Sequence, residues 1–170
     1  MKPDEELPRV AEQRVRSIGG TSRVVRLDGA GVEMSWEATG RIVVTEHFPS
    51  GTREHVGEFD GSGEFRVVDL QDGRRTPALA DTARTRSNPY GTAVEREEFA
   101  YFAVERTYDD DARLCRTTVT GDWGELAADV RTDGSRRLRW NLAAVDVEVI
   151  VGADGRAGDP VMRRLPKEHQ

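Results

Sequence analysis

The chain has 170 residues, of which 36% are apolar and 33% charged, and its formal net charge is -6. This size and composition predict one domain with a single core, and no apolar run approaches the roughly 20 residues of a membrane-spanning helix. The acidic balance argues against nucleic acid as a partner, because binding to a phosphate backbone needs a basic surface. We therefore expect neither a membrane span nor a nucleic-acid partner.

The start of the chain and its cysteine usage point to the cytoplasm. Residues Met1 to Glu6 are acidic and lack the basic start and apolar middle of a secretory signal. The one cysteine, Cys115, fits a reducing compartment and cannot by itself assemble a thiolate metal cluster. We expect a cytoplasmic protein without a metal or another cofactor.

Residues 1–20 predict a short amphipathic helix. Apolar residues recur there at helical spacing, namely Val10, Ala11, Val15 and Ile18. Acidic residues stand at its start, arginines stand near its end, and a glycine pair follows, as in many helices. This helix either packs across one end of the domain or acts as a mobile lid.

From Ser22 to Val151, apolar and polar residues alternate with period two between turn dipeptides such as Asp-Gly. The alternation predicts strands near 22–28, 32–38, 41–48, 53–59, 63–70, 97–108, 113–123, 125–131, 136–143 and 145–151. We therefore expect an all-β fold, an antiparallel up-and-down β-barrel of about 8–10 strands like that of the lipocalins, over residues 21–152. A β-sandwich is the alternative, because it uses the same alternation.

Two segments depart from this pattern. Residues Arg74 to Ala93 contain two prolines and few apolar residues, which predicts a connection of about twenty residues, longer than most loops. This loop either covers a barrel mouth or is a disordered excursion. Residues 153–170 are polar and predict a loosely held tail.

A predicted hairpin at Ser50-Gly51 brings a carboxylate to an imidazole. If these two residues form the loop, Glu46 faces His55 on a mostly apolar, inward face. In such a place the two pKa values shift apart, and the pair can move a proton. The alternative is an ordinary cross-strand charge pair near a solvated hairpin tip.

Two later hairpins are predicted in the same way. A turn near residues 109–112 sets Val104 opposite Thr117, and a three-residue loop at 133–135 sets Ala128 opposite Trp140. Both pairings give plausible core contacts.

The large side chains on the faces predicted to point inward are Met34, Trp36, Phe102, Trp123 and Trp140. An indole brings a large apolar area and one hydrogen-bond donor. Such residues either fill a solid core, which is the commoner case, or line a ligand cavity. The supply of large apolar residues is modest for ten strands, which gives a reason to consider a cavity.

The stretch from His47 to Val68 resembles the early strands of the allene oxide cyclase-like barrels, in particular bacterial cofactor-free polyketide cyclases. The residues that carry this resemblance are Phe48-Pro49-Ser50-Gly51, Gly57, Gly61-Ser62-Gly63 and Phe65-Arg66-Val67-Val68. The resemblance implies a short helix before an eight-stranded barrel, and an apolar cavity that folds a linear substrate for cyclisation. Such an enzyme works by confinement and needs neither a nucleophile nor a metal.

Two functional hypotheses follow. In the first, the chain binds an apolar or amphipathic small molecule and catalyses its cyclisation or isomerisation. The five large residues above would form the cavity wall, and Glu46 and His55 the catalytic polar groups. In the second, the chain is a non-catalytic ligand-binding or protein-interaction barrel with a solid core. Either protein is expected as a monomer or a homodimer.

Overall fold

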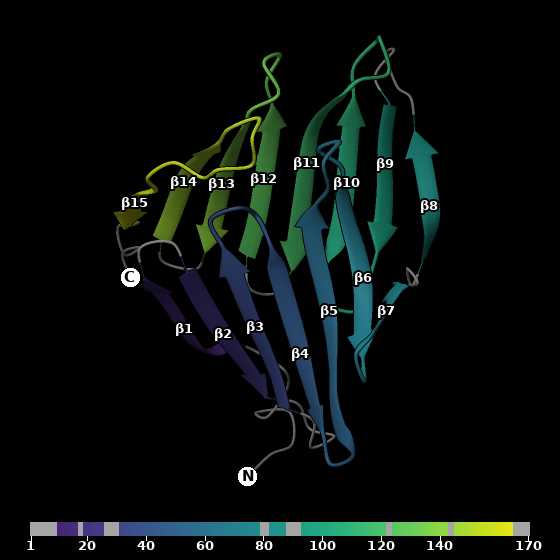
Figure 1. Cartoon of the computed structure of the whole chain (residues 1–170), viewed down its shortest axis with the longest axis vertical. Helices are drawn as coiled ribbons and strands as arrows, with labels where there is room; N and C mark the ends of the chain where they lie inside the picture. The colour runs from purple at the N-terminus through teal and green to yellow at the C-terminus, as the bar shows by residue number, and fades with distance from the viewer. Residues whose placement is uncertain are drawn as a thin grey trace, which may run out of the picture. The chain divides into compact units, whose positions relative to one another are not determined.

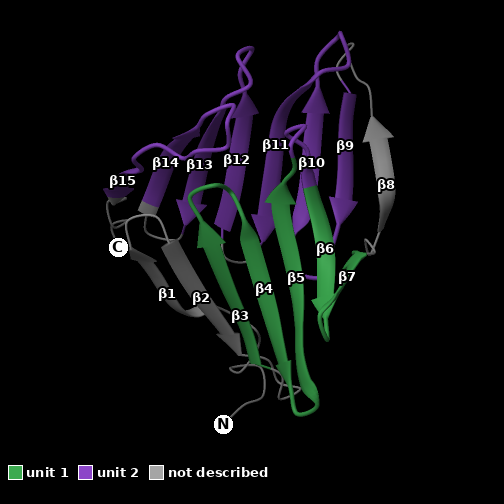
Figure 2. Cartoon of the chain, viewed as in Figure 1, with its two compact units in different colours: residues 1–60, 66–78 green, residues 61–65, 79–170 purple. Residues whose placement is uncertain are grey.

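The computed structural model describes residues 10–16, 19–25, 31–78, 82–87, 93–121, 124–142 and 145–164. The chain divides into two compact units (Figure 2). Unit 1 comprises residues 1–60 and 66–78, and unit 2 comprises residues 61–65 and 79–170.

The described strands form two antiparallel sheets, labelled in Figure 1. The N-terminal sheet has the order β1-β2-β3-β4-β5-β6-β7. Its strands are β1 (Val10–Arg16), β2 (Gly19–Val25), β3 (Gly31–Glu37), β4 (Ile42–Phe48), β5 (Gly51–Phe59), β6 (Phe65–Gln71) and β7 (Arg74–Pro77). Each strand therefore pairs with its neighbours in sequence, as short turn connections dictate.

The C-terminal sheet has the order β15-β14-β13-β12-β11-β10-β9-β8. Its strands are β8 (Thr82–Ser87), β9 (Ala93–Glu98), β10 (Ala103–Tyr108), β11 (Leu114–Gly121), β12 (Gly124–Val130), β13 (Arg136–Leu142), β14 (Val145–Val151) and β15 (Val161–Arg164). The described residues contain no helix. The prediction of an all-β, antiparallel fold is thus confirmed for the described residues.

The predicted N-terminal helix is wrong where the structure describes it. Residues Val10–Arg16 form β1, which pairs with β2 from Val10 opposite Val24 to Arg16 opposite Gly19. The apolar positions that suggest a helix span only Val10 to Ile18, and helices shorter than about 12–15 residues are marginal because nucleation is costly. Pairing with a neighbouring strand satisfies the same backbone groups. The glycine pair that was interpreted as a helix end therefore begins β2.

Two segments predicted as irregular also contain strands. Within the predicted loop from Arg74 to Ala93, β7 pairs with β6, and β8 pairs with β9. The last residue of β7 is Pro77, and β7 is an edge strand, where the missing N–H is tolerated. Within the predicted tail, β15 pairs with β14 over Val161 to Arg164. Period-two hydrophobicity is weak in such short edge strands, so the sequence pattern missed them.

Each sheet buries one face, as the period-two alternation requires. In unit 1 the buried face consists of Val32, Met34, Trp36, Ile42, Val44, Glu46, His55, Gly57, Val67 and Asp69. In unit 2 the buried face includes Val104, Arg106, Thr117, Val119, Leu126, Ala128, Leu138, Trp140, Leu142, Val147 and Val149. Both faces are mainly apolar, and a few polar side chains interrupt each of them.

The β4–β5 hairpin keeps the predicted faces but shifts the predicted partners by two residues. Phe48 pairs with Gly51, which makes Pro49-Ser50 the loop, and Glu46 pairs with Arg53. His55 accordingly lies opposite Val44 and not opposite Glu46. A shift of two preserves the side-chain alternation, so Glu46 and His55 still share the buried face.

The other two predicted hairpins show the same kind of error. The partners are displaced by two residues: Val104 faces Val119 rather than Thr117, and Ala128 faces Leu138 rather than Trp140. Hydrophobic alternation fixes which face a residue occupies, whereas the turn fixes its partner. The face was therefore predictable from the sequence, whereas the cross-strand partner was not.

Candidate functional site

The buried face of unit 1 carries polar side chains at the end nearest the β4–β5 turn. Glu46 is the last buried residue of β4, and it lies beside Val32 of β3 in the strand register. His55 comes from β5, and Asp69 comes from the second half of β6. Three neighbouring strands thus each contribute one largely buried ionisable group to a face that is mainly apolar.

These groups form a continuous line of contacts. Nε2 of His55 lies 2.7 Å from Oε1 of Glu46, and its Nδ1 lies 2.7 Å from Oδ1 of Asp69. Nη2 of Arg53 donates to the other carboxylate oxygen of Asp69, at 3.2 Å. We call this line, Arg53–Asp69–His55–Glu46, the charged chain.

Burial separates the charged chain from ordinary surface pairs. The side chains of His55, Glu46 and Asp69 are 12%, 11% and 15% exposed, whereas Arg53 is 44% exposed. Water therefore screens the inner contacts poorly, and electrostatic interactions there are stronger than at the surface. The charged chain begins at the half-exposed guanidinium of Arg53 and ends at the largely buried carboxylate of Glu46.

The two contacts of His55 indicate how many protons the charged chain holds. A neutral imidazole has one N–H donor and one acceptor nitrogen, and a carboxylate has only acceptors. Because both ring nitrogens lie at hydrogen-bond distance from carboxylate oxygens, each contact needs a bridging proton. With both protons on the ring, two positive and two negative groups alternate along the chain and their formal charges cancel. This arrangement can pass a proton between two carboxylates through the ring.

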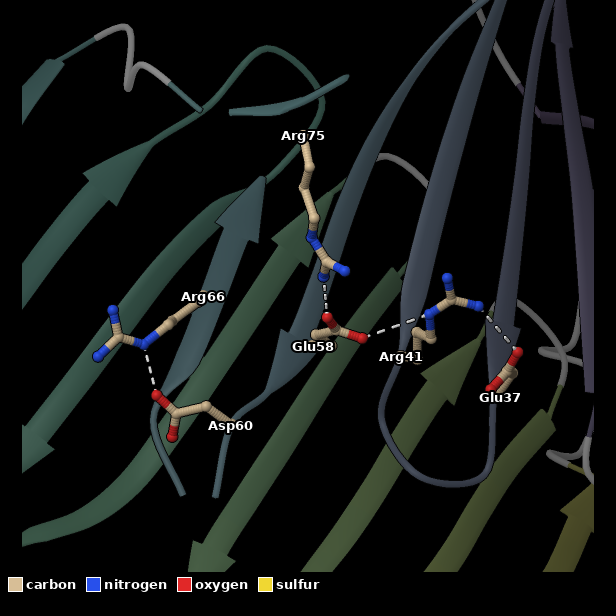
Figure 3. A network of polar contacts seen from close by, with 6 residues as sticks. All are labelled: Glu37, Arg41, Glu58, Asp60, Arg66 and Arg75. Atoms are coloured by element: carbon tan, nitrogen blue, oxygen red, sulfur yellow. Dashed lines mark hydrogen bonds and ion pairs between the residues drawn. The ribbon is translucent and has the colours of Figure 1, made fainter. Parts of the chain in front are cut away.

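The outer surface of unit 1 shows the contrasting case (Figure 3). There Glu58 contacts both Arg41 and Arg75, and Arg41 also contacts Glu37. The side chains in this network are 35–58% exposed. Such exposed pairs typically contribute about 0–1 kcal/mol each to stability. We therefore place the candidate chemistry on the charged chain and not on this network.

The structure brings together the two predicted catalytic residues, Glu46 and His55, although through a diagonal contact. The sequence reasoning missed Asp69 and Arg53. Asp69 follows Val67 at a spacing of two, so it occupies an inward position of its strand. A carboxylate at such a position was the signal that could have identified it.

The predicted wall residues are distributed over both units. Met34 and Trp36 lie on the buried face of unit 1, 3% and 4% exposed, where they pair with Val44 and Ile42. Phe102 and Trp140 are buried in unit 2. Trp123 lies outside the described residues. Met34 and Trp36 therefore share a sheet face with the charged chain and form its apolar surroundings.

Within the described part of the chain, no group of three or more His, Cys, Asp and Glu side chains has an arrangement that could hold a metal ion. No helix among the described residues has the length and apolar character needed to cross a membrane. Comparison with models of known protein families, with curated proteins and with solved structures gives no match. Function is therefore inferred from the geometry of the charged chain and its apolar surroundings.

Proposed function

We propose that the protein binds an apolar or amphipathic small molecule on the buried face of unit 1 and cyclises or isomerises it without a cofactor. One observation carries this proposal: an imidazole is held between two largely buried carboxylates on a face that also bears Met34 and Trp36. Burial and proximity of this kind are typical of groups that transfer protons.

In an isomerisation, one proton leaves the substrate and another returns at a different atom. Glu46 accepts the first proton as a carboxylate, and the imidazolium of His55 donates the second. The proton on Glu46 then moves across the 2.7 Å contact to Nε2 of His55, which restores both groups to their starting states. Asp69 holds the ring in place through Nδ1 throughout this cycle.

For a cyclisation, the apolar face supplies the larger effect. Holding the two reacting ends of a flexible molecule in contact removes much of the entropic barrier. The indole of Trp36 and the thioether side chain of Met34 provide broad, adaptable apolar contacts for such a molecule. This role agrees with the resemblance to cofactor-free polyketide cyclases. The up-and-down order within each sheet supports the barrel class, because sandwiches commonly use Greek-key connections.

A second candidate is a non-catalytic module with a solid core. The full burial of Trp140, Leu126 and Leu138 in unit 2 favours it, because these side chains pack as core residues do. This candidate predicts that small apolar molecules do not bind.

A fluorescence titration distinguishes the two candidates. All-trans-retinol, an apolar polyene, is added to the full chain while tryptophan emission is followed, with a detergent as the control ligand. The proposal predicts saturable quenching that falls in Trp36→Phe and persists in Trp140→Phe, because Trp36 lies on the proposed binding face. Flat curves for wild type, or equal quenching in both variants, would contradict it.

A further inference from the structure

Unit 2 contains a buried guanidinium. The side chain of Arg106, on β10, is 3% exposed. Its Nη1 donates to Oε1 of Glu97, and its Nη2 donates to the backbone oxygen of Phe65, each at 2.7 Å. These two contacts fix the plane and direction of the guanidinium. The N–H of its third nitrogen, Nε, is therefore also held in a fixed direction.

Two buried polar atoms on directly paired residues lack a hydrogen-bond partner within the described residues. They are Nε of Arg106 and Oγ1 of Thr117. Arg106 pairs with Thr117 across β10 and β11, and both residues are at most 2% exposed. Directly opposed residues have Cβ atoms about 4.5–5.5 Å apart. One small acceptor placed between them can therefore receive both an N–H and an O–H.

The charges around Arg106 decide which acceptor fits. Glu97 already neutralises the guanidinium, Oε1 of Glu64 lies 3.8 Å from its Nε, and Glu95 is its strand partner on β9. The same negative charges act on Tyr108, whose pKa is raised by burial, by Glu95 and by Glu64. A further anion would meet repulsion here, whereas a neutral oxygen would not.

The neighbouring positions on the same face are apolar. Val104 and Val119 form the next pair on this face, two residues further along each strand, and Leu126 continues this row toward Trp140. All four side chains are at most 1% exposed. These two donors, which make no hydrogen bond within the described residues, thus stand at the border between a polar cluster and an apolar row. This border suits a molecule with one polar atom and an apolar body.

We propose that Arg106 and Thr117 form a second binding site, in which Nε–H and Oγ1–H donate to the neutral carbonyl oxygen of an apolar ketone, ester or amide. This site belongs to unit 2 and does not depend on catalysis at the charged chain. A carbonyl oxygen has two lone pairs and accepts both hydrogen bonds, while the apolar row takes the hydrocarbon body. A buried water molecule is the competing occupant, and the test below separates the two.

The test uses three probes of equal length and two variants of the full chain. The probes are 2-decanone labelled with carbon-13 at the carbonyl, decane and decanoate, and binding is followed by calorimetry and carbon-13 resonance. Thr117→Val removes the hydroxyl at nearly constant volume. Thr118→Val, one position along the same strand and on its opposite face, is the matched control.

The proposal predicts that 2-decanone binds more tightly than either decane or decanoate, and that its carbonyl resonance moves downfield on binding. Thr117→Val is expected to weaken 2-decanone binding about tenfold, which is the effect of one hydrogen bond, while Thr118→Val leaves the affinity unchanged. Because Oγ1 of Thr117 has no partner among the described residues, Thr117→Val should fold at least as stably as wild type. Absence of 2-decanone binding, equal affinity for ketone and hydrocarbon, or wild-type affinity in Thr117→Val would overturn the proposal. If wild type does not bind 2-decanone and Thr117→Val is less stable than wild type, a buried water molecule occupies the site between Arg106 and Thr117.

Discussion

His55 and Glu46 contact each other at 2.7 Å although neither is the strand partner of the other. The register pairs His55 with Val44 and Glu46 with Arg53, so the contact runs diagonally across β4 and β5. Diagonal neighbours in a sheet are about 7–8 Å apart at Cα, within reach of long side chains. The other ring nitrogen, Nδ1, points to the opposite side and contacts Oδ1 of Asp69.

This arrangement predicts a large loss of stability when the imidazole is removed. In His55→Asn, the two largely buried carboxylates lose the group that links them, which is expected to cost about 3 kcal/mol in free energy of unfolding. Urea denaturation measures the change. His47→Asn is the matched control. His47 lies on the other face of the β4–β5 hairpin, and its side chain is 49% exposed. Its Nε2 lies 3.6 Å from Oε1 of Glu33 on β3. The control should stay within about 0.5 kcal/mol of wild type. Equal losses in the two variants would contradict the interpretation.

The β12 strand begins at a glycine that no other residue should replace. Gly124 has a φ of +136°, and an added Cβ would lie 2.1 Å from the backbone oxygen of Asn141. Since that oxygen belongs to the paired strand, it cannot move aside without disrupting the sheet. Gly124→Ala is therefore expected to lower the free energy of unfolding by more than about 2 kcal/mol. Thermal melts measure the stability of both variants. Gly61→Ala, where nothing lies within 4 Å of the added Cβ, should be nearly neutral. A neutral Gly124→Ala would refute the β12–β13 geometry.

The pKa of Tyr108 gives a prediction for alkaline pH. Burial raises this pKa above its ordinary value of 10.0, and the negative charges of Glu95 and Glu64 raise it further. The folded chain therefore keeps the phenolic proton at a pH where the unfolded chain loses it. By linkage, the associated stability is fully present below about pH 10 and decreases as the pH rises through the folded-state pKa.

Ultraviolet titration of tyrosinate checks this assignment. Glu95→Gln is expected to lower the pKa of Tyr108, because it removes the negative charge and replaces the carboxylate acceptor by a neutral, weaker amide oxygen. The matched control is Glu105→Gln, on the opposite face of β10, where Glu105 contacts Arg96. The control should leave the titration unchanged. An unchanged titration in Glu95→Gln would show that Glu95 does not act on Tyr108.

Part of the candidate site was predictable from sequence. Alternation placed Glu46 and His55 on one inward face, and this stayed true when the register shifted by two residues. The partners were not predictable, because the same Pro-Ser-Gly segment is compatible with more than one turn. Asp69 was missed because its strand had not been aligned with the β4–β5 hairpin.

The fold errors have a similar origin. Val10, Val15 and their neighbours fit a helical period over a short stretch, but pairing with β2 decides the backbone. Pairing between strands is a tertiary property that a single segment does not encode. The edge strands β7 and β15 have only four residues each, which is too few to show a clear period-two alternation.

The most direct test of the central claim is turnover of linear polyenes that carry a tetramate-like head group. The full chain is incubated with each compound, and chromatography with mass detection follows a product of unchanged mass. Wild type and His47→Asn should form this product at similar rates. His55→Asn and the nearly isosteric Glu46→Gln should be slower by at least about 100-fold, as expected when a general acid or base is lost. Circular dichroism confirms that the variants are folded. No product with wild type, or wild-type rates in both His55→Asn and Glu46→Gln, would contradict the account.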